Sequence, residues 1–255
     1  MRKKKLNEEQ EERYSRQIIV DEFGLKGQLA LLNSNVLIIG CGGLGTAALT
    51  YLSMSGIGRI GIVDFDKISL SNLSRQMLFD EKEVGKSKVK IAMKKITSIN
   101  SRTELKIFEE KISKKNIKKI FKDYEIVLDC TDNFKSRYLI NDECFNEKKI
   151  LITAAIQGFD VQLFALKPWH NKIYPCYRCI FPENNKIHQL NNCNELGVLS
   201  PVAGLGGVMQ AISTIKVIMN HGSNIFSTFQ VHDTLNDIYN VFKCEKDSNC
   251  KICKS

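Results

Sequence analysis

The segment Asn35–Gly45 (NVLIIGCGGLG) decides the fold class of this 255-residue chain. Its first five residues form an apolar, partly β-branched run, which predicts a buried parallel strand. The glycines then follow the G-x-G-x-x-G spacing: Gly40 permits a tight turn, Gly42 lets the backbone approach a phosphate, and Gly45 lets a helix pack close to the strand. The helix expected at residues 46–54 offers its free N–H groups to an anion. The segment therefore predicts a nucleotide-binding strand–loop–helix unit, and Gly43 belongs to the same loop.

Outward from this segment, strands and helices alternate. We expect strands at residues 59–64, 104–108, 125–129 and 150–154, with helices at 86–99, 114–121 and 134–147 between them. This alternation is typical of a Rossmann-like, doubly wound α/β fold with a mostly parallel sheet.

The two ends of the chain depart from this alternation. Residues 1–12 are charged and are expected to be disordered, and residues 13–32 are expected to be helical, with Gly24 and Gly27 interrupting. Beyond Gly158, strands at 161–166 and 228–231 follow without crossover helices of the same kind. They predict an antiparallel extension of the sheet. We therefore expect a single integrated domain over residues 1–255.

Polar residues follow the second strand. Asp64 ends that strand, 19 residues after Gly45, where a carboxylate commonly holds ribose hydroxyls. The segment 64–76 is dense in polar groups, and Lys88 comes soon after. An Arg and a Lys that converge here suit a triphosphate, because two cations can hold charge that moves onto a departing pyrophosphate. The competing interpretation is that Arg75 and Lys88 are solvated surface charges.

A second acid lies beyond a later strand, in Asp129–Asn133 (DCTDN). Ligands of doubly wound sheets collect at the carboxyl ends of the strands, which is where Asp132 falls. Magnesium prefers one or two carboxylates together with phosphate oxygens, so Asp132 is a candidate magnesium ligand. Asp129 is the weaker candidate because it still belongs to the strand.

Two cysteine pairs have metal-ligand spacing: Cys176 with Cys179, and Cys250 with Cys253. Each C-x-x-C pair can bring both thiolates to one zinc ion, and two pairs complete a tetrahedral site. A site with four thiolates leaves no open position for substrate. We therefore expect a structural zinc site that ties the last residues to the body of the protein.

The bulk composition is that of a globular protein, with 43% hydrophobic and 25% charged residues. A net charge of +9 permits a nucleic-acid or acidic protein partner, but no pattern of interleaved aromatic and basic residues supports nucleic-acid binding. Nine cysteines, an odd number, and a polar N-terminus without an apolar leader favour a reducing cytoplasm. The uncharged stretch 196–215 is interrupted by Pro201 and glycines, so we expect a closely packed buried helix in place of a membrane span.

These motifs together resemble the ThiF/MoeB/HesA family, the bacterial relatives of ubiquitin-activating enzymes. The resemblance runs in order from Arg13 to Cys253, and rests on residues 13–17 (RYSRQ), the glycine loop, 64–66 (DFD), 71–76 (SNLSRQ), 129–133 and both cysteine pairs. It implies a homodimeric adenylyltransferase that uses ATP and magnesium to activate the C-terminal glycine of a ubiquitin-like sulfur carrier ending in Gly-Gly. A cysteine-desulfurase-type sulfur donor would be a further partner.

The resemblance also assigns roles to residues. The loop glycines line the nucleotide, Asp64 with Asp66 lies at the ribose, and Asp132 binds magnesium. The phosphates are contacted by Asn72, Arg75, Gln76 and Lys88. Arg16 would reach into the site of the partner subunit; the alternative is a local ion pair with Glu12. Zinc would be held by Cys176, Cys179, Cys250 and Cys253.

Cys193 lies in the polar stretch 191–195, where a cysteine of such proteins attacks the adenylated carrier or joins sulfur transfer. An exposed thiol suits that role, and a tolerated loop cysteine is the equal alternative. Residues 159–163 and 167–169 favour a ThiS-like carrier slightly over a MoaD-like one. Alternative functions are activation of a small molecule or a tRNA base, a NAD-dependent oxidoreductase, or an inactive scaffold subunit.

Overall fold

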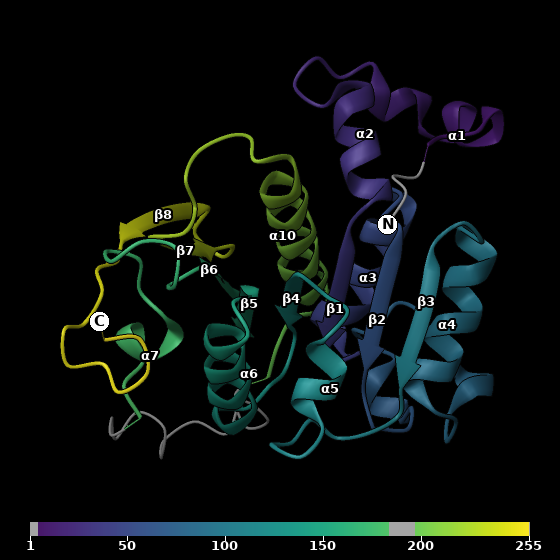
Figure 1. Cartoon of the computed structure of the whole chain (residues 1–255). Coiled ribbons are helices and arrows are strands. Elements are labelled where there is room, and N and C mark those ends of the chain that lie inside the picture. Colours follow the sequence, from purple (N-terminus) through teal and green to yellow (C-terminus); the bar gives the residue numbers. More distant parts are fainter. Residues whose placement is uncertain (1–4, 184–196, 255) are drawn as a thin grey trace.

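The computed structural model describes residues 5–183 and 197–254. Their strands form one sheet in the order β3-β2-β1-β4-β5-β6-β7-β8 (Figure 1). Neighbours from β3 to β5 are parallel, and those from β5 to β8 are antiparallel, which confirms the expected α/β fold with its antiparallel extension. The strands are β1 (Asn35–Ile39), β2 (Arg59–Val63), β3 (Glu104–Phe108), β4 (Ile126–Asp129), β5 (Ile150–Gln157), β6 (Asp160–Leu166), β7 (Thr228–Asp233) and β8 (Ile238–Lys243).

Helices cover both faces of this sheet. One core lies between the sheet and α2, α3, α4 and α10, and the other lies between the sheet and α5, α6 and α7. The helices are α1 (Glu8–Ile18), α2 (Gly24–Leu32), α3 (Gly43–Met54), α4 (Lys88–Ile99), α5 (Ile117–Phe121), α6 (Phe134–Asn146), α7 (Tyr177–Ile180) and α10 (Ser200–Met219), with 3-10 turns η1 (Leu70–Asn72) and η2 (Glu81–Glu83).

The register brings the functional loops to one edge. Ile39 at the end of β1 pairs with Val63 at the end of β2 and with Asp129 at the end of β4. Because these strands are parallel, the segments that follow them leave the sheet side by side. The glycine loop, the Asp64 segment and the Asp132 segment therefore meet at the carboxyl ends of the strands.

By length and composition, helix α10 could cross a membrane, but 44% of an apolar 18-residue stretch within it is buried inside the protein. Its small residues pack directly on α3. A methyl group at Gly207 would come within 2.3 Å of the carbonyl oxygen of Leu44 and 2.8 Å of Cβ of Ala47. The backbones of the two helices therefore approach closely, which confirms the expectation of a buried, closely packed helix.

The N-terminal segment corrects two expectations. Helix α1 begins at Glu8, because the Asn7 side chain accepts a hydrogen bond from the N–H of Gln10 and the Gln10 side chain accepts one from Asn7. The prediction that residues 1–12 are disordered is therefore wrong from residue 8 onward. Residues 19–23 separate α1 from α2, and Gly24, with φ of +58°, is the first residue of α2. Gly27 lies inside α2 and interrupts nothing.

Candidate nucleotide site and cysteine cluster

A cavity of about 500 Å³ opens at the carboxyl edge of the parallel strands. It collects almost all of the residues that the sequence predicts for a nucleotide site. The predicted residues that line it are Gly40, Gly42, Gly43, Asp64, Asp66, Asn72, Arg75, Gln76, Lys88 and Asp132. Gly45 is the exception, because it supports the loop from behind: a methyl group there would lie 1.9 Å from the carbonyl oxygen of Gly40.

The glycine loop is held in place by the acid at the end of β2. The N–H of Cys41 donates to Oδ2 of Asp64 at 2.6 Å, and the N–H of Asp66 donates to Oδ1 of Asp64 at 2.8 Å. Gly40 has a φ of +98°, which strongly favours glycine, and no room for a side chain, because Cβ would lie 2.7 Å from the oxygen of Cys130. The loop is therefore shaped before any ligand arrives.

Two cations line the cavity together. Lys88, only 5% exposed, places its Nζ 3.1 Å from Oδ2 of Asp66. Arg75 donates from Nη1 to the carbonyl oxygen of Ser71 at 3.0 Å. A partly desolvated ammonium and a guanidinium at one cavity wall favour an anionic ligand, since their attraction is less screened there than in water. The alternative of dispersed, solvated surface charges does not fit the buried Lys88.

Asp129 and Asp132 have different environments. The Asp129 carboxylate is fully buried and accepts hydrogen bonds from the N–H and hydroxyl of Thr131 and from the hydroxyl of Thr153. Asp132 is exposed and lines the cavity, with Oδ1 contacting Nδ2 of Asn133 at 3.2 Å. Asp129 thus shapes the turn, and Asp132 keeps lone pairs free for a cation such as magnesium.

Sequence reasoning missed Arg137, which is 6% exposed and also lines the cavity. Its Nη2 donates to the carbonyl oxygen of Thr131 at 2.6 Å, and its Nη1 donates to the hydroxyl of Thr153 at 3.2 Å. A signal was present: Arg137 follows the cap residue Asn133 by one helical turn, which directs it back to the loop. The cavity also includes Phe65, Ser71, Glu110, Lys111, Ile112, Thr131, Asn133, Ala155, Ile156, Gly197 and Val198, none of which was a candidate.

One candidate lies elsewhere, and another falls outside the described residues. Arg16 is exposed on α1 and does not line the cavity of its own chain. Between described residues, no ion pair joins Arg16 to Glu12, so the local alternative is not formed. Cys193 lies outside the described residues, and its role stays a prediction.

The four zinc candidates come together. The Sγ atoms of Cys176, Cys179, Cys250 and Cys253 all lie within 4.8 Å of one another. Individual sulfur–sulfur distances are 3.6, 3.9 and 3.3 Å. Zn–S bonds of about 2.3 Å in a tetrahedron separate the sulfurs by about 3.8 Å, so the cluster has the dimensions of a four-thiolate zinc site. Hydrogen bonds from neighbouring thiols lower the pKa of Cys179, which favours a thiolate there.

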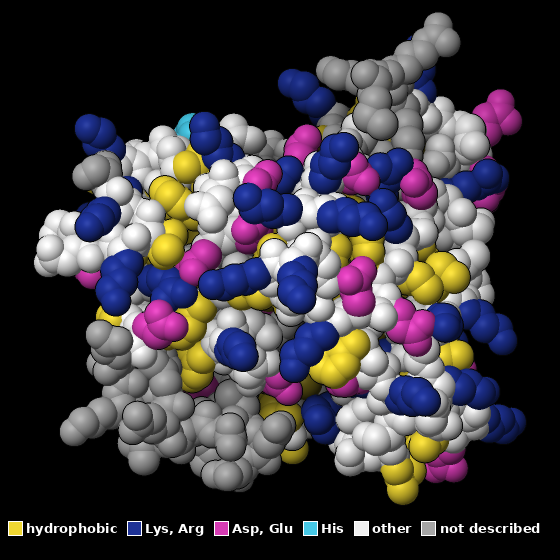
Figure 2. Space-filling view, turned by 60° about the horizontal axis from the view of Figure 1, so that its bottom comes forward, with side chains coloured by type: hydrophobic (Ala, Val, Ile, Leu, Met, Phe, Trp, Pro, Cys, Tyr) yellow, Lys and Arg dark blue, Asp and Glu magenta, His cyan; other side chains and the backbone are white. Residues whose placement is uncertain are grey.

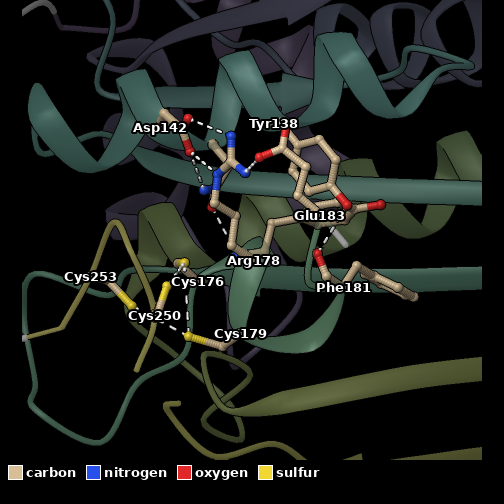
Figure 3. A network of polar contacts seen from close by, with 11 residues as sticks. Tyr138, Asp142, Cys176, Arg178, Cys179, Phe181, Glu183, Cys250 and Cys253 are labelled. Carbon is tan, nitrogen blue, oxygen red and sulfur yellow. Dashed lines mark hydrogen bonds and ion pairs between the residues drawn. The ribbon is translucent and has the colours of Figure 1, made fainter. Parts of the chain in front are cut away.

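Arg178 ties this cluster to α6 (Figure 3). It lies between the first two cysteines and binds Asp142 through two hydrogen bonds, of 2.7 and 2.8 Å, and Glu183 through a third of 2.6 Å. Its guanidinium also lies 4.4 Å from the ring centroid of Tyr138. The carboxylate of Asp142 raises the pKa of Arg178. Since α6 begins just after Asp132, the cluster is connected to the edge that carries the cavity.

Three further cysteines lie outside the cluster and are buried in the protein. Desolvation raises the pKa of the thiols of Cys41, Cys130 and Cys144, so they are poor nucleophiles at neutral pH. They behave as small apolar residues of the core.

The surface around the carboxyl edge is rich in positive charge. Figure 2, in which the bottom of Figure 1 comes forward, shows Lys and Arg side chains gathered across this side. Residues 111–122 contain six lysines and no acid, and Lys111 itself lines the cavity. Such a field raises the local concentration of anionic ligands.

Residues 14–252 match the model of the ThiF family. The chain belongs to the ThiF family. The resemblance seen in the sequence is therefore confirmed.

Relatives with curated descriptions are named "Adenylyltransferase and sulfurtransferase MOCS3". The protein of Dictyostelium discoideum is 35% identical over 244 residues, which are 95% of this chain and 57% of that protein. The protein of Drosophila persimilis is 38% identical over 252 residues, which are 98% of this chain and 55% of that protein. The chain thus spans about half the length of the curated relatives it matches.

Solved structures share the fold at lower identity. A crystal structure of E. coli MccB with ATP has a TM-score of 0.83 and 23% identity, and covers 95% of this chain and 75% of that chain. A crystal structure of PaaA has a TM-score of 0.79 and 21% identity, and covers 97% of this chain and 77% of that chain. At this identity the likeness concerns the fold alone.

Proposed function

We propose that this protein is an ATP-dependent adenylyltransferase that activates the C-terminal glycine carboxylate of a ubiquitin-like sulfur carrier ending in Gly-Gly. One observation carries the proposal: Arg75, Lys88 and Asp132 line the same cavity as the glycine loop and Asp64. The names of the MOCS3 relatives and the ThiF family support the same chemistry.

The chemistry follows from the groups present. A carboxylate is already a nucleophile at neutral pH, so the reaction needs no general base. It must approach the α-phosphate of ATP, and two anions repel each other unless cations offset the repulsion. Arg75 and Lys88 would hold the phosphates, Asp132 would hold magnesium, and catalysis would come mainly from positioning and charge stabilisation.

A NAD-dependent oxidoreductase would use the glycine loop and Asp64 in a similar way. It has no need for two cations and a free carboxylate beside the phosphates. The intact cluster also disfavours an inactive scaffold subunit. These features support adenylation over both alternatives.

We also propose a homodimer in which Arg16 completes the site of the partner subunit. Arg16 is exposed on α1 and is absent from its own cavity. Apolar side chains that exceed 40% exposure lie on the turn after α1 and on α2, α3 and α10, of which α10 contacts both α2 and α3: Ile19, Val20, Leu25, Tyr51, Met54 and Ile212. A second copy of the chain would cover them, as in the self-complementary interface of a symmetric dimer.

The carrier, the sulfur donor, the role of Cys193 and the cytoplasmic location remain predictions. The weak preference of the sequence for a ThiS-like over a MoaD-like carrier belongs with them. Zinc at the cysteine cluster would be structural, because four thiolates saturate its coordination.

ATP–pyrophosphate exchange with the purified protein and a carrier ending in Gly-Gly tests the proposal. We expect exchange only when a carrier is present, and the carrier that supports it, ThiS-like or MoaD-like, identifies the pathway. Absence of exchange with both carriers would reject the proposal. Tight binding of NADH in place of ATP would favour the oxidoreductase instead.

A further inference from the structure

Among the described residues, three amide side chains line the cavity, and two of them are already engaged. Oδ1 of Asn72 accepts a hydrogen bond from the N–H of Ser69. Asn133 caps α6 by accepting from the N–H of Ser136. Gln76 differs from both, because neither end of its carboxamide has a partner among the described residues.

This lack of partners is unusual for a buried group. Gln76 is 3% exposed, and its Oε1 is buried without a hydrogen bond. Most buried side-chain polar atoms are paired, and an exception calls for a ligand, a water or a functional reason. Oε1 is shielded in the observed orientation, but Gln76 lines the cavity, so a bound ligand can supply the missing partner once the carboxamide turns.

Gln76 lies away from the end of the cavity at which Asp64 is expected to hold a ribose. Asp64 and Phe65 follow β2, and Lys111 follows β3, on one side of the glycine loop. Nε2 of Gln76 lies 3.8 Å from the Cβ position of Gly42, and Arg75 next to it contacts the Cβ position of Gly43. That position also contacts Ala203 of α10, on the side of β5. Gln76 therefore lies between the glycine loop and the end of the cavity near β5.

The end of the cavity near β5 exposes main-chain groups of Val198 that have no hydrogen-bond partner among the described residues. The N–H of Gly158 donates to the oxygen of Gly197, and the N–H of Leu199 donates to the oxygen of Gly158. In this parallel bridge, Val198 points its own N–H and C=O away from Gly158. Val198 lines the cavity, and neither group has a hydrogen-bond partner among the described residues. An extended peptide can pair with such an edge.

The chemistry of an amide favours a peptide group as its partner. A phosphate has only acceptor oxygens, so it can use the N–H groups of Gln76 and leaves Oε1 unpaired. A peptide group offers a donor and an acceptor and can use both ends. The terminal torsion of glutamine is broad, so the carboxamide can turn to present either atom.

We propose that Gln76 reads the last peptide group of the substrate tail and thereby positions the terminal carboxylate beside the α-phosphate. The proposal rests on the proposed function, since the tail is that of the carrier. Gln76 acts as a specificity-determining residue because it recognises a peptide group of the tail. The main chain of Val198 aligns the tail residues that precede this peptide group.

The test is a double-mutant cycle between Gln76→Met and a semisynthetic carrier whose last peptide bond is an ester. The ester removes one N–H with little change of shape. For the wild-type protein, we expect either change to lower kcat/KM for the carrier about tenfold, as one lost hydrogen bond to a buried group does. When the substitution and the ester are combined, kcat/KM should fall by less than twofold beyond the loss that either change causes alone. Dissociation of ATP measured without carrier should change by less than about threefold.

Three outcomes are informative. If the two changes together lower kcat/KM by the product of their separate effects, the proposal is overturned, because Gln76 then does not contact the N–H of the last peptide bond. An ATP affinity that falls as much as kcat/KM would make Gln76 a phosphate ligand only. No exchange by the wild-type protein with the unmodified carrier would instead reject the proposed function itself.

Stability supplies a control that a structural role would not satisfy. Gln76→Met removes an unpaired amide, so the free protein should melt at an equal or higher temperature. Gln210→Met is the matched variant, because its Nε2 donates to the oxygens of Asp129 and Ile152 at 3.0 and 3.2 Å. It should melt at a clearly lower temperature. A Gln76→Met variant that melts as low as Gln210→Met would show that Gln76 serves the fold.

Discussion

The backbone N–H of Cys41 donates a 2.6 Å hydrogen bond to Oδ2 of Asp64, which joins the glycine loop to the acid expected at the ribose. The second oxygen, Oδ1, accepts from the N–H of Asp66 at 2.8 Å. One carboxylate therefore shapes both segments and keeps further lone pairs for hydroxyl groups of a ligand.

This geometry predicts that Asp64→Asn is not a mild change. Either orientation of the new amide directs its NH₂ group at a backbone N–H, of Cys41 or of Asp66. We expect the free energy of unfolding to fall by about 1–3 kcal/mol and the KM for ATP to rise at least about tenfold. Asp66→Asn keeps an acceptor for Lys88, so denaturant melts and exchange kinetics should show smaller losses. Equal effects of the two variants would contradict this account.

Gly45 should tolerate no side chain. Its Cβ would lie 1.9 Å from the carbonyl oxygen of Gly40 and 2.9 Å from the carbonyl carbon. Because both atoms are backbone, Gly45→Ala should destabilise the protein by about 3 kcal/mol or more and abolish ATP binding. Gly204→Ala in α10 is the matched control, since nothing lies within 4 Å of that position. Thermal melts should show it to be neutral or about 1 kcal/mol more stable.

Asp132 should matter for catalysis and not for folding. Its carboxylate is exposed, and within the described part of the chain it accepts one hydrogen bond, from Nδ2 of the neighbouring Asn133. Asp132→Asn should lower carrier-dependent exchange by about 100-fold or more, because a magnesium ligand is lost from the phosphate site. The melting temperature should stay within about 2 °C of the wild type. Retention of full exchange activity would remove Asp132 from the site.

Arg16 predicts complementation between two inactive variants. If it acts in the partner's cavity, Arg16→Ala and Asp132→Ala subunits form mixed dimers with one intact site. After random exchange of subunits, about a quarter of all sites should regain activity. Size-exclusion chromatography should show a dimer, and titration of one variant with the other should show the recovery. No recovery in verified mixed dimers would place Arg16 outside the partner's site.

The cysteine cluster predicts one tightly bound zinc ion per chain. Cys250→Ser should abolish metal content, measured by inductively coupled plasma mass spectrometry, and lower the melting temperature, because zinc binding contributes folding free energy. Cys244→Ser is the control: that thiol is only partly buried and lies outside the cluster. A strong chelator should reproduce the effect of Cys250→Ser. Full stability of the metal-free protein would exclude a structural role.

Local patterns in the sequence predicted much of the parallel half. The run that ends at Ile39 and the glycines after it specify β1, the loop and α3, because a buried strand and a tight turn leave a clear record in residue type. The strand at 104–108 was predicted with its observed bounds, and both C-x-x-C pairs were recognised by spacing. Strand β8 was missed because all of its residues are exposed, so no burial pattern marks it.

The remaining facts concern residues that are far apart in the chain and depend on tertiary packing. The sequence by itself determined which residues could bind phosphate, magnesium or zinc, because each of those chemistries requires particular side chains at short spacing. Only the folded chain decided that the Asp129 carboxylate accepts hydrogen bonds from Thr131 and Thr153, whereas the Asp132 carboxylate is exposed at the cavity. It also revealed Gln76 as an unpaired amide in the cavity. Whether a polar group is paired depends on neighbours that the fold brings together, and no local pattern encodes them.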